Sequence, residues 1–204
     1  MKQELIFVVD PMCSWCWGFS PVLEVLRERS DFVCSVVVGG LRSKGQMHWD
    51  DSSKNYLQGH WEQVAKNTGQ PFNDTLFEKE VFDYDTYPAC KAIVTVRELF
   101  GSQKAFDYLT ILQEAFYVKG TDITQKSVLV GLLDSLDIDT KAFETFYNSQ
   151  RAQVMMEHDF AKARSMGANA FPSVVIIDKD GHMVCEKGYR TLENMNELLG
   201  ENDA

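Results

Sequence analysis

The order of strand and helix patterns along the first 40 residues is the feature that most constrains this fold. Leu5–Val9 is a short apolar run that predicts a buried strand. Residues 31–40, DFVCSVVVGG, are rich in β-branched side chains and predict a second buried strand. Between them apolar residues recur at helical spacing, at Phe19, Val22, Leu23 and Leu26. So short a crossover indicates two parallel strands with a right-handed connection.

From about residue 45 to residue 148 the strand patterns disappear and helical periods take their place. The expected helices are Asn55–Thr68, Tyr87–Phe100, Lys104–Tyr117, Lys126–Leu136 and Thr140–Asn148. A sheet pattern resumes after this block, so we interpret the block as an insertion.

The last part of the chain returns to the pattern of the first. A helix is expected over about Gln150–Met166, followed by a strand in PSVVIID, a turn at residues 179–181, a strand in HMVCEKG and a helix over about Leu192–Leu199. Asp180-Gly181 between two apolar runs predicts a hairpin. The chain is therefore predicted to be an α/β protein. Residues 1–44 and 149–204 would form a four-stranded domain, and residues 45–148 an inserted helical domain.

Charge and composition exclude some classes of function. The formal net charge is −10, so the chain has no general attraction to nucleic acid or anionic lipid, and neither is expected as a partner. The apolar stretch in the opening MKQELIFVVD is too short for the hydrophobic region of a signal peptide, so we expect a cytoplasmic protein. No segment is left over for a dimerisation domain, and a monomer is the default expectation.

Cys13 and Cys16 lie in VVDPMCSWCWGFSP, where the first strand ends and the first helix begins. A helix start offers unpaired N–H groups and a positive dipole end, which stabilise a thiolate. The thiolate is the form that attacks disulfides. Cys16 lies one turn further on the same helix face, so it can close a disulfide with Cys13. The spacing therefore favours a reversible two-electron couple.

Two other uses of the cysteine pair are weaker. A zinc site needs four ligands, and the remaining cysteines and histidines are single and scattered, so no metal is expected. A structural disulfide is unstable in a reducing cytosol. Cys34 and Cys185 fall in strands and are expected to be buried small apolar residues, and Cys90 is expected to pack in a helix.

Two prolines and two further residues complete the candidate site. Pro21 lies inside the first helix and is expected to kink it. Phe171-Pro172 opens a strand, where proline is tolerated on steric grounds alone, but a cis peptide there would leave the preceding backbone free to pair with an extended substrate. Trp15 is a candidate for gripping substrate. Asp10 is a candidate for tuning proton transfer, although a residue in its place more often only ends a strand.

A strand, a C-x-x-C motif opening a proline-containing helix and a distant proline opening the third strand together resemble the thioredoxin fold. With the helical insertion, the chain resembles the DsbA family of thiol-disulfide oxidoreductases. The stretches DPMCSWCWGF, HWEQVAKNTGQPF, YPACKAIVTVREL and DIT…SVL are similar to its FrnE-like, signal-less branch. The resemblance implies that Cys13 attacks, that Cys16 resolves and that Pro172 is a cis-proline facing the disulfide. It also implies that Phe171 helps to hold the substrate backbone.

The residues between the two cysteines differ from the better-known relatives. Ser14-Trp15 replaces the Pro-His pair of the strongly oxidising family member and the Gly-Pro pair of thioredoxin. We expect Ser14 and Trp15 to set the redox potential, and the direction of the reaction stays open.

The predicted function is exchange of disulfides with protein or small-molecule thiols, without a bound cofactor and with glutathione as a candidate partner. One alternative is a glutathione-dependent enzyme that resembles the kappa-class transferases or the chromene-carboxylate isomerases. Those enzymes usually place serine at the first catalytic position, where this chain has Cys13. Another alternative is a non-catalytic, chaperone-like binding module.

Overall fold

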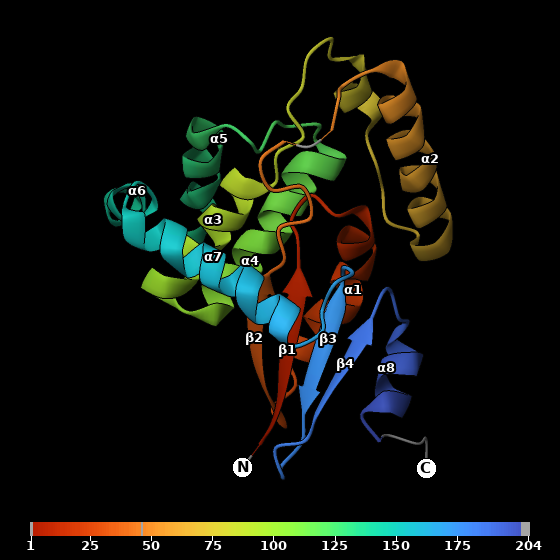
Figure 1. Cartoon of the computed structure of the whole chain (residues 1–204), viewed down its shortest axis with the longest axis vertical. Coiled ribbons are helices and arrows are strands. Elements are labelled where there is room, and N and C mark those ends of the chain that lie inside the picture. The colour runs from red at the N-terminus through yellow and green to blue at the C-terminus, as the bar shows by residue number, and fades with distance from the viewer. Residues whose placement is uncertain (1, 46, 201–204) are drawn as a thin grey trace.

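The computed structural model describes residues 2–45 and 47–200, and its centre is one four-stranded sheet (Figure 1). The strands are β1 (Gln3–Val9), β2 (Phe32–Val38), β3 (Ser173–Ile177) and β4 (Met183–Lys187), in the order β2-β1-β3-β4. β1 pairs with β2 in parallel and with β3 antiparallel, and β3 pairs antiparallel with β4. The predicted parallel first half and terminal hairpin are both confirmed.

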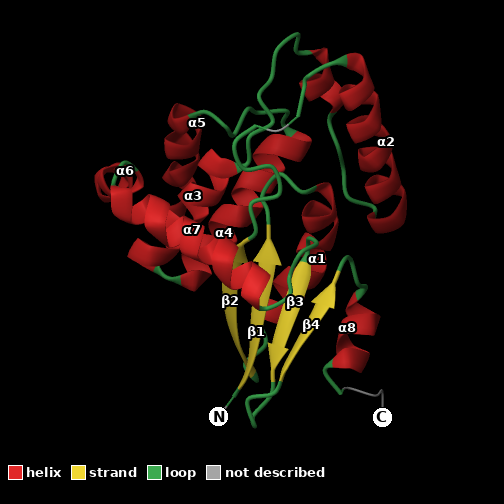
Figure 2. Ribbon diagram, in the orientation of Figure 1, coloured by secondary structure: helices red, strands yellow, loops and turns green. Residues whose placement is uncertain are grey.

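Helices cover both faces of the sheet, which explains why β1 is a continuous apolar run rather than an alternating one (Figure 2). On one face, Ile6 and Val8 pack in a cluster with Ala163 and Met166 at the end of α7 (Gln150–Ser165). On the other face, the rings of Phe7 and Phe19 lie 6.5 Å apart, which joins β1 to α1 (Ser14–Arg27). The last helix, α8 (Leu192–Leu198), adds the buried side chain of Met195 to the same core as Phe7.

The segment between β2 and α7 is helical, as predicted. Its elements are α2 (Asp51–Thr68), η1 (Asp74–Glu78), α3 (Tyr87–Phe100), α4 (Ser102–Gln113), η2 (Glu114–Val118), α5 (Lys126–Gly131), η3 (Leu132–Leu136) and α6 (Thr140–Tyr147). Phe106 of α4 meets Phe7 of β1 edge to face at 5.7 Å, so the core of the sheet continues into this segment. The division of the chain into two domains stays a prediction.

The expected helices differ from the observed ones by more than two residues in three places. The helix expected over Lys104–Tyr117 is α-helical only to Gln113 and then widens into the π-helical turn η2. The helix expected over Lys126–Leu136 tightens after Gly131 into the 3₁₀ turn η3. Helix α2 begins earlier than expected because the side chain of Asp50 accepts a bond from the Ser53 N–H and caps it.

A buried ion pair protects β2, which lies at the edge of the sheet. The Val38 N–H donates to Asp159 Oδ2 at 3.0 Å. Arg97 Nη1 donates both to Val36 O at 2.9 Å and to Asp159 Oδ2 at 2.6 Å. The pair thus provides hydrogen-bond partners for the Val36 C=O and the Val38 N–H, which lie on the side of β2 that no other strand pairs with. It also connects α3 and α7 to that strand.

Within the described part of the chain, no helix has both the length and the apolar character that crossing a bilayer requires.

Candidate active site

Cys13 is the N-cap residue of α1, in an extended conformation with φ −91° and ψ 115°. Its carbonyl accepts hydrogen bonds from the N–H of Cys16 at 2.9 Å and from that of Trp17 at 3.1 Å, so the helix begins directly after it. Its side chain caps none of the N–H groups of the helix. The sulfur therefore stands at the positive end of α1, free for other contacts.

The two thiols differ in burial, and the pKa of Cys16 is shifted. Both are reduced, and Cys13 is 7% exposed whereas Cys16 is 1% exposed. Burial raises the pKa of the Cys16 thiol well above its ordinary value, and the hydrogen bond and negative charge of Cys13 raise it further. Cys16 is thus a protonated, inward thiol, and Cys13 is the more exposed of the two.

The loop before β3 brings Phe171 to the cysteines. The Phe171–Pro172 peptide bond is cis, as the resemblance implies. The thiol of Cys13 donates to the carbonyl oxygen of Phe171 at 3.5 Å. The ring of Phe171 lies against Gly39, where a Cβ atom would come within 2.0 Å of the ring. The segment after β1, the segment after β2 and the segment before β3 therefore meet at the same end of the sheet, where β1 and β2 finish and β3 begins.

A cleft of about 270 Å³ opens beside Cys13. Its lining residues are Met12, Cys13, Ser14, Trp15, Leu41, Arg42, Tyr56, Leu57, His60, Trp61, Tyr84, Ala170 and Phe171. Of the residues predicted from the sequence, Cys13, Ser14, Trp15 and Phe171 line this cleft, while Cys16, Pro172 and Asp10 are buried outside its lining. Trp15 is half-buried and rests on the ring of Tyr189 at 5.7 Å.

Asp10 is a fully buried carboxylate. Its Oδ1 accepts from the Met12 N–H at 2.9 Å, and its Oδ2 accepts from the Leu41 N–H at 2.7 Å and from the Cys90 thiol at 3.4 Å. Burial raises the pKa of Asp10 above its ordinary value, although the hydrogen bonds of Met12 and Leu41 oppose the shift. Asp10 thus joins the cysteine loop to the segment after β2, and its redox-tuning role stays a prediction.

Several residues of the cleft were missed in the sequence, among them Arg42, Tyr84 and the face of α2 that carries Tyr56, His60 and Trp61. Tyr84 donates its hydroxyl to Met12 O at 2.8 Å, and the guanidinium carbon of Arg42 lies 5.1 Å from the centre of the Tyr84 ring. Arg42 follows the carboxyl end of β2, and parallel strands end at the same edge of a sheet. That rule could have pointed to Arg42. No such rule marks Tyr84, and the stretch that begins at His60 carries the family resemblance without indicating that α2 lines the site.

The other three cysteines lie away from the cleft lining. Cys90 is fully buried in α3, as expected. Cys34 and Cys185 lie in the strands β2 and β4, but the expectation that they are buried was wrong, because both are half-buried. Partial burial raises the pKa of Cys34 to about 11, so its thiol is a poor nucleophile at neutral pH.

One group among the described residues has the spacing of metal ligands. Asp178, Asp180 and His182 lie together on the β3–β4 turn, at the end of the sheet opposite Cys13. The group is largely exposed, and His182 Nδ1 lies 3.0 Å from Asp178 Oδ2.

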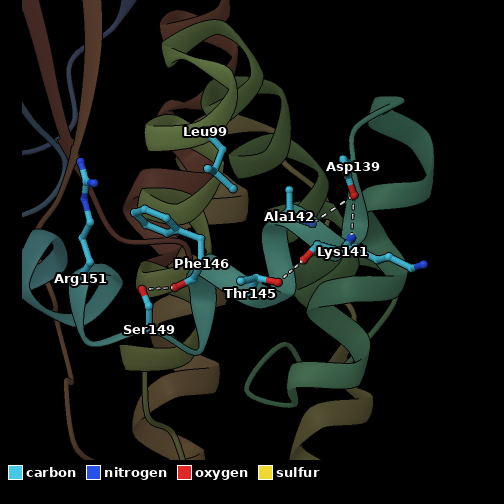
Figure 3. Close-up of a pocket in the computed structure, with 8 residues that line it drawn as sticks. All are labelled: Leu99, Asp139, Lys141, Ala142, Thr145, Phe146, Ser149 and Arg151. Carbon is cyan, nitrogen blue, oxygen red and sulfur yellow. Dashed lines mark hydrogen bonds between the residues drawn. The ribbon is translucent and has the colours of Figure 1, made fainter.

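A second hollow, of about 510 Å³, lies beside α6 and shares no lining residue with the cleft (Figure 3). It is lined by Leu99, Asp139, Lys141, Ala142, Thr145, Phe146, Ser149 and Arg151. Its hydroxyl groups are used locally, since Thr145 donates to Lys141 O at 2.8 Å and Ser149 donates to Phe146 O at 2.6 Å. None of the residues that line it is a cysteine, so this hollow does not adjoin Cys13 or Cys16.

Among curated proteins, the chain is similar to the ClpXP adapter protein SpxH of Bacillus subtilis. The two are 25% identical over 182 residues, which is 86% of this chain. The chain spans 58% of the length of that relative.

Solved structures match over nearly the whole length of both chains. A candidate protein disulfide isomerase from Nitrosomonas europaea is 32% identical, with a TM-score of 0.85 and coverage of 98% of this chain and 97% of that one. The cytosolic disulfide reductase DsbM of Pseudomonas aeruginosa, also solved with GSH, shares the fold at 23% identity with a TM-score of 0.80 and 97% of each chain covered. A 2-hydroxychromene-2-carboxylate isomerase shares the fold at 17% identity, with a TM-score of 0.69 over 97% of this chain and 94% of that one.

A family profile described as Thioredoxin matches residues 6–197. DsbA oxidoreductases also share the fold, among them that of Xylella fastidiosa at a TM-score of 0.61, with 98% of this chain and 85% of that one covered at 15% identity. The FrnE-like branch stays a prediction. The match over residues 6–197, together with the sheet order and the C-x-x-C motif at the start of α1, shows that this chain belongs to the thioredoxin family and has a DsbA-like fold.

Proposed function

We propose that this protein is a thiol-disulfide oxidoreductase that exchanges disulfides with small-molecule or protein thiols through Cys13 and Cys16. The observation that carries the proposal is the position of the Cys13 sulfur. It lies at the start of α1, at the wall of a cleft and 3.5 Å from the carbonyl oxygen of Phe171. The disulfide-exchange names of the solved relatives support the same chemistry.

In the reducing direction the reaction takes two exchanges. The Cys13 thiolate attacks one sulfur of a substrate R–S–S–R′, forming a mixed disulfide Cys13–S–S–R and releasing R′S⁻, which takes a proton from water. Cys16 then gives up its proton and attacks the Cys13 sulfur, which releases RS⁻ and closes the Cys13–Cys16 disulfide. Two electrons have moved from the cysteine pair to the substrate. A dithiol, or two molecules of a monothiol, returns the pair to its reduced form.

The different environments of the thiols set the order of these steps. The Cys16 pKa is raised by burial and by the nearby charge of Cys13, so Cys16 stays protonated while Cys13 is free. Once Cys13 enters a mixed disulfide its negative charge is gone, and that contribution to the Cys16 pKa disappears. The resolving thiol therefore becomes easier to ionise at the step in which it is needed.

The proposal extends to partners and setting. The relative DsbM has been solved with GSH, which makes glutathione the first recycling partner to test for this chain. Pro172 and Phe171 would flank the bound disulfide, and Ser14 and Trp15 would tune the potential of the couple. We place the protein in the cytoplasm, as a monomer that needs no bound cofactor. Equilibration with glutathione buffers measures the direction. A potential near the cytosolic poise marks a reductase, and a clearly higher one marks an oxidant or isomerase.

Cysteine variants test the mechanism. Cys13→Ser should abolish the reduction of insulin, because no other thiol lies in the cleft lining. Cys16→Ala should accumulate mixed disulfides, which mass spectrometry detects. Cys185→Ser is the matched control, since that thiol lies in β4, and it should retain full activity. Unchanged insulin reduction in the Cys13 variant would refute the mechanism.

Two other functions make different predictions. The adapter name of the curated relative favours a protein-binding role, which would survive the loss of both Cys13 and Cys16 in a binding assay. The second alternative is a glutathione-dependent transferase or isomerase, since the chain shares its fold with a 2-hydroxychromene-2-carboxylate isomerase. That activity would show saturable glutathione binding and would persist in Cys16→Ala.

A further inference from the structure

The charge of the cleft is opposite to the charge of the whole chain. The protein has 30 acidic and 20 basic side chains. Yet of the described residues that line the cleft, none is Asp or Glu. Arg42 is the one charged side chain in that lining, and His60 is the one further titratable base. A negatively charged molecule, which the net negative charge of the chain repels, would therefore meet a cation beside Cys13.

Arg42 is held in place by its own backbone and by an aromatic ring. Its N–H donates to Thr86 Oγ1 at 3.2 Å, and its carbonyl accepts from the Thr86 N–H at 3.3 Å. Its guanidinium lies over Tyr84, and Tyr84 is itself fixed by the hydrogen bond of its hydroxyl to Met12 O. Thr86 and Tyr84 thus preorganise the arginine before any substrate arrives.

The guanidinium of Arg42 keeps its donors free. It makes no hydrogen bond or ion pair to a side chain of residues 2–45 or 47–200. Two carboxylates bond to the same loop, but they are used elsewhere. Asp10 accepts from the Leu41 N–H, and Asp85 accepts from the N–H groups of Lys44 and Tyr87. The planar guanidinium group matches a carboxylate with two parallel hydrogen bonds.

From these observations we propose that Arg42 binds a carboxylate of the substrate, and that the cleft therefore selects small disulfides that carry a carboxylate near the sulfur. The inference rests on the proposed oxidoreductase function and names its substrate class. The cleft volume of about 270 Å³ suits a low-molecular-weight disulfide. With the carboxylate on Arg42 and one sulfur at Cys13, the substrate is held at both ends, so Arg42 acts on binding rather than on the exchange itself.

Three disulfides of similar length and different charge test the proposal: 3,3′-dithiodipropionate (anionic), 2-hydroxyethyl disulfide (neutral) and cystamine (cationic). The wild type should turn over the anion with the highest kcat/KM. Arg42→Gln should lose about 10- to 100-fold in kcat/KM on the anion, mostly through KM, because charge-assisted hydrogen bonds are lost. It should change by less than about twofold on the neutral disulfide. Arg42→Lys should retain part of the preference, since it keeps the charge without the planar fork.

Lys44→Gln is the matched control, because it removes one positive charge from the same loop outside the cleft lining. It should leave all three rates within about twofold of wild type. Equal losses on all three disulfides in Arg42→Gln would overturn the proposal. Such losses, with alkylation of Cys13 by iodoacetamide shifted to higher pH, would show that Arg42 stabilises the thiolate instead. If the wild type turned over none of the three disulfides but still reduced insulin, the proposed substrate class would be refuted. If it reduced neither the three disulfides nor insulin, the proposed function itself would be refuted, which separates the two failures.

Discussion

Gly39 offers a direct test of the packing that holds Phe171 beside Cys13. A Cβ atom at this position would lie 2.0 Å from Cε1 and 2.1 Å from Cζ of the Phe171 ring. Carbon atoms in contact normally lie about 3.5–4.0 Å apart, so in Gly39→Ala the ring must retreat by roughly 1.5–2 Å. The carbonyl oxygen of Phe171 accepts a hydrogen bond from the Cys13 thiol. A displacement of Phe171 is therefore expected to disturb the Cys13 sulfur as well as the core.

The size of the effect follows from steric overpacking. Inserting a methyl group into a packed site destabilises by about 1–3 kcal/mol. In a protein of this size each kcal/mol lowers Tm by about 2–4 °C, so Gly39→Ala should lose about 2–12 °C. In the double variant Gly39→Ala/Phe171→Ala the new methyl meets no ring. Its loss of stability should be smaller than the sum of the single losses by about 1–3 kcal/mol.

Urea unfolding of the reduced wild type, the two single variants and the double variant measures this coupling, and insulin reduction measures the effect on Cys13. Gly59→Ala is the matched control, since Gly59 lies inside α2 and the added Cβ would meet no atom within 4 Å apart from its chain neighbours and the backbone of its own helix. There alanine should stabilise the helix by up to about 1 kcal/mol. Strictly additive losses at Gly39 and Phe171 would refute the reasoning, because the two side chains would then not compete for one space.

Three further outcomes are expected. Asp159→Ala leaves Arg97 with Glu98 as its ion-pair partner and removes the acceptor of the Val38 N–H, so it should lower the free energy of unfolding in urea by about 1–3 kcal/mol, whereas no measurable loss would contradict the pairing. Burial raises the pKa of Asp10 above 3.8, so its stabilising contribution is complete below that value and is lost as pH rises through the raised pKa. The unfolding free energy of the wild type relative to Asp10→Asn should therefore fall as pH rises above 3.8, and a constant difference would contradict the raised pKa. In the reduced protein near neutral pH, iodoacetamide should label Cys13 and spare Cys16, whose thiol burial keeps protonated. Mass spectrometry after a brief exposure would reject this by finding equal labelling.

Local patterns predict an element well where its own side chains determine it. Helix α3 has the predicted bounds Tyr87–Phe100, since its apolar period is regular, Pro88 opens it and Gly101 follows it. The start of α2 escapes the same reasoning, because its first turn is polar and depends on the cap from Asp50. The change from α-helix to 3₁₀ helix after Gly131 could not be predicted in this way either, because the helical spacing of apolar residues continues through both segments.

The sequence by itself determined the strand and helix order around Cys13 and Cys16, because hydrophobic periodicity and the strand-to-helix position of the motif are local properties of the chain. The family resemblance added Phe171 and Pro172, which local patterns alone leave ambiguous. Only the tertiary structure brought Arg42, Tyr84 and the face of α2 to the cleft. The burial of apolar side chains favours any arrangement that covers the sheet, because the hydrophobic effect is not directional. The pattern of one segment therefore does not show which other segment it packs against. Which part of the insertion lies over Cys13 is decided by how all the apolar faces pack at once.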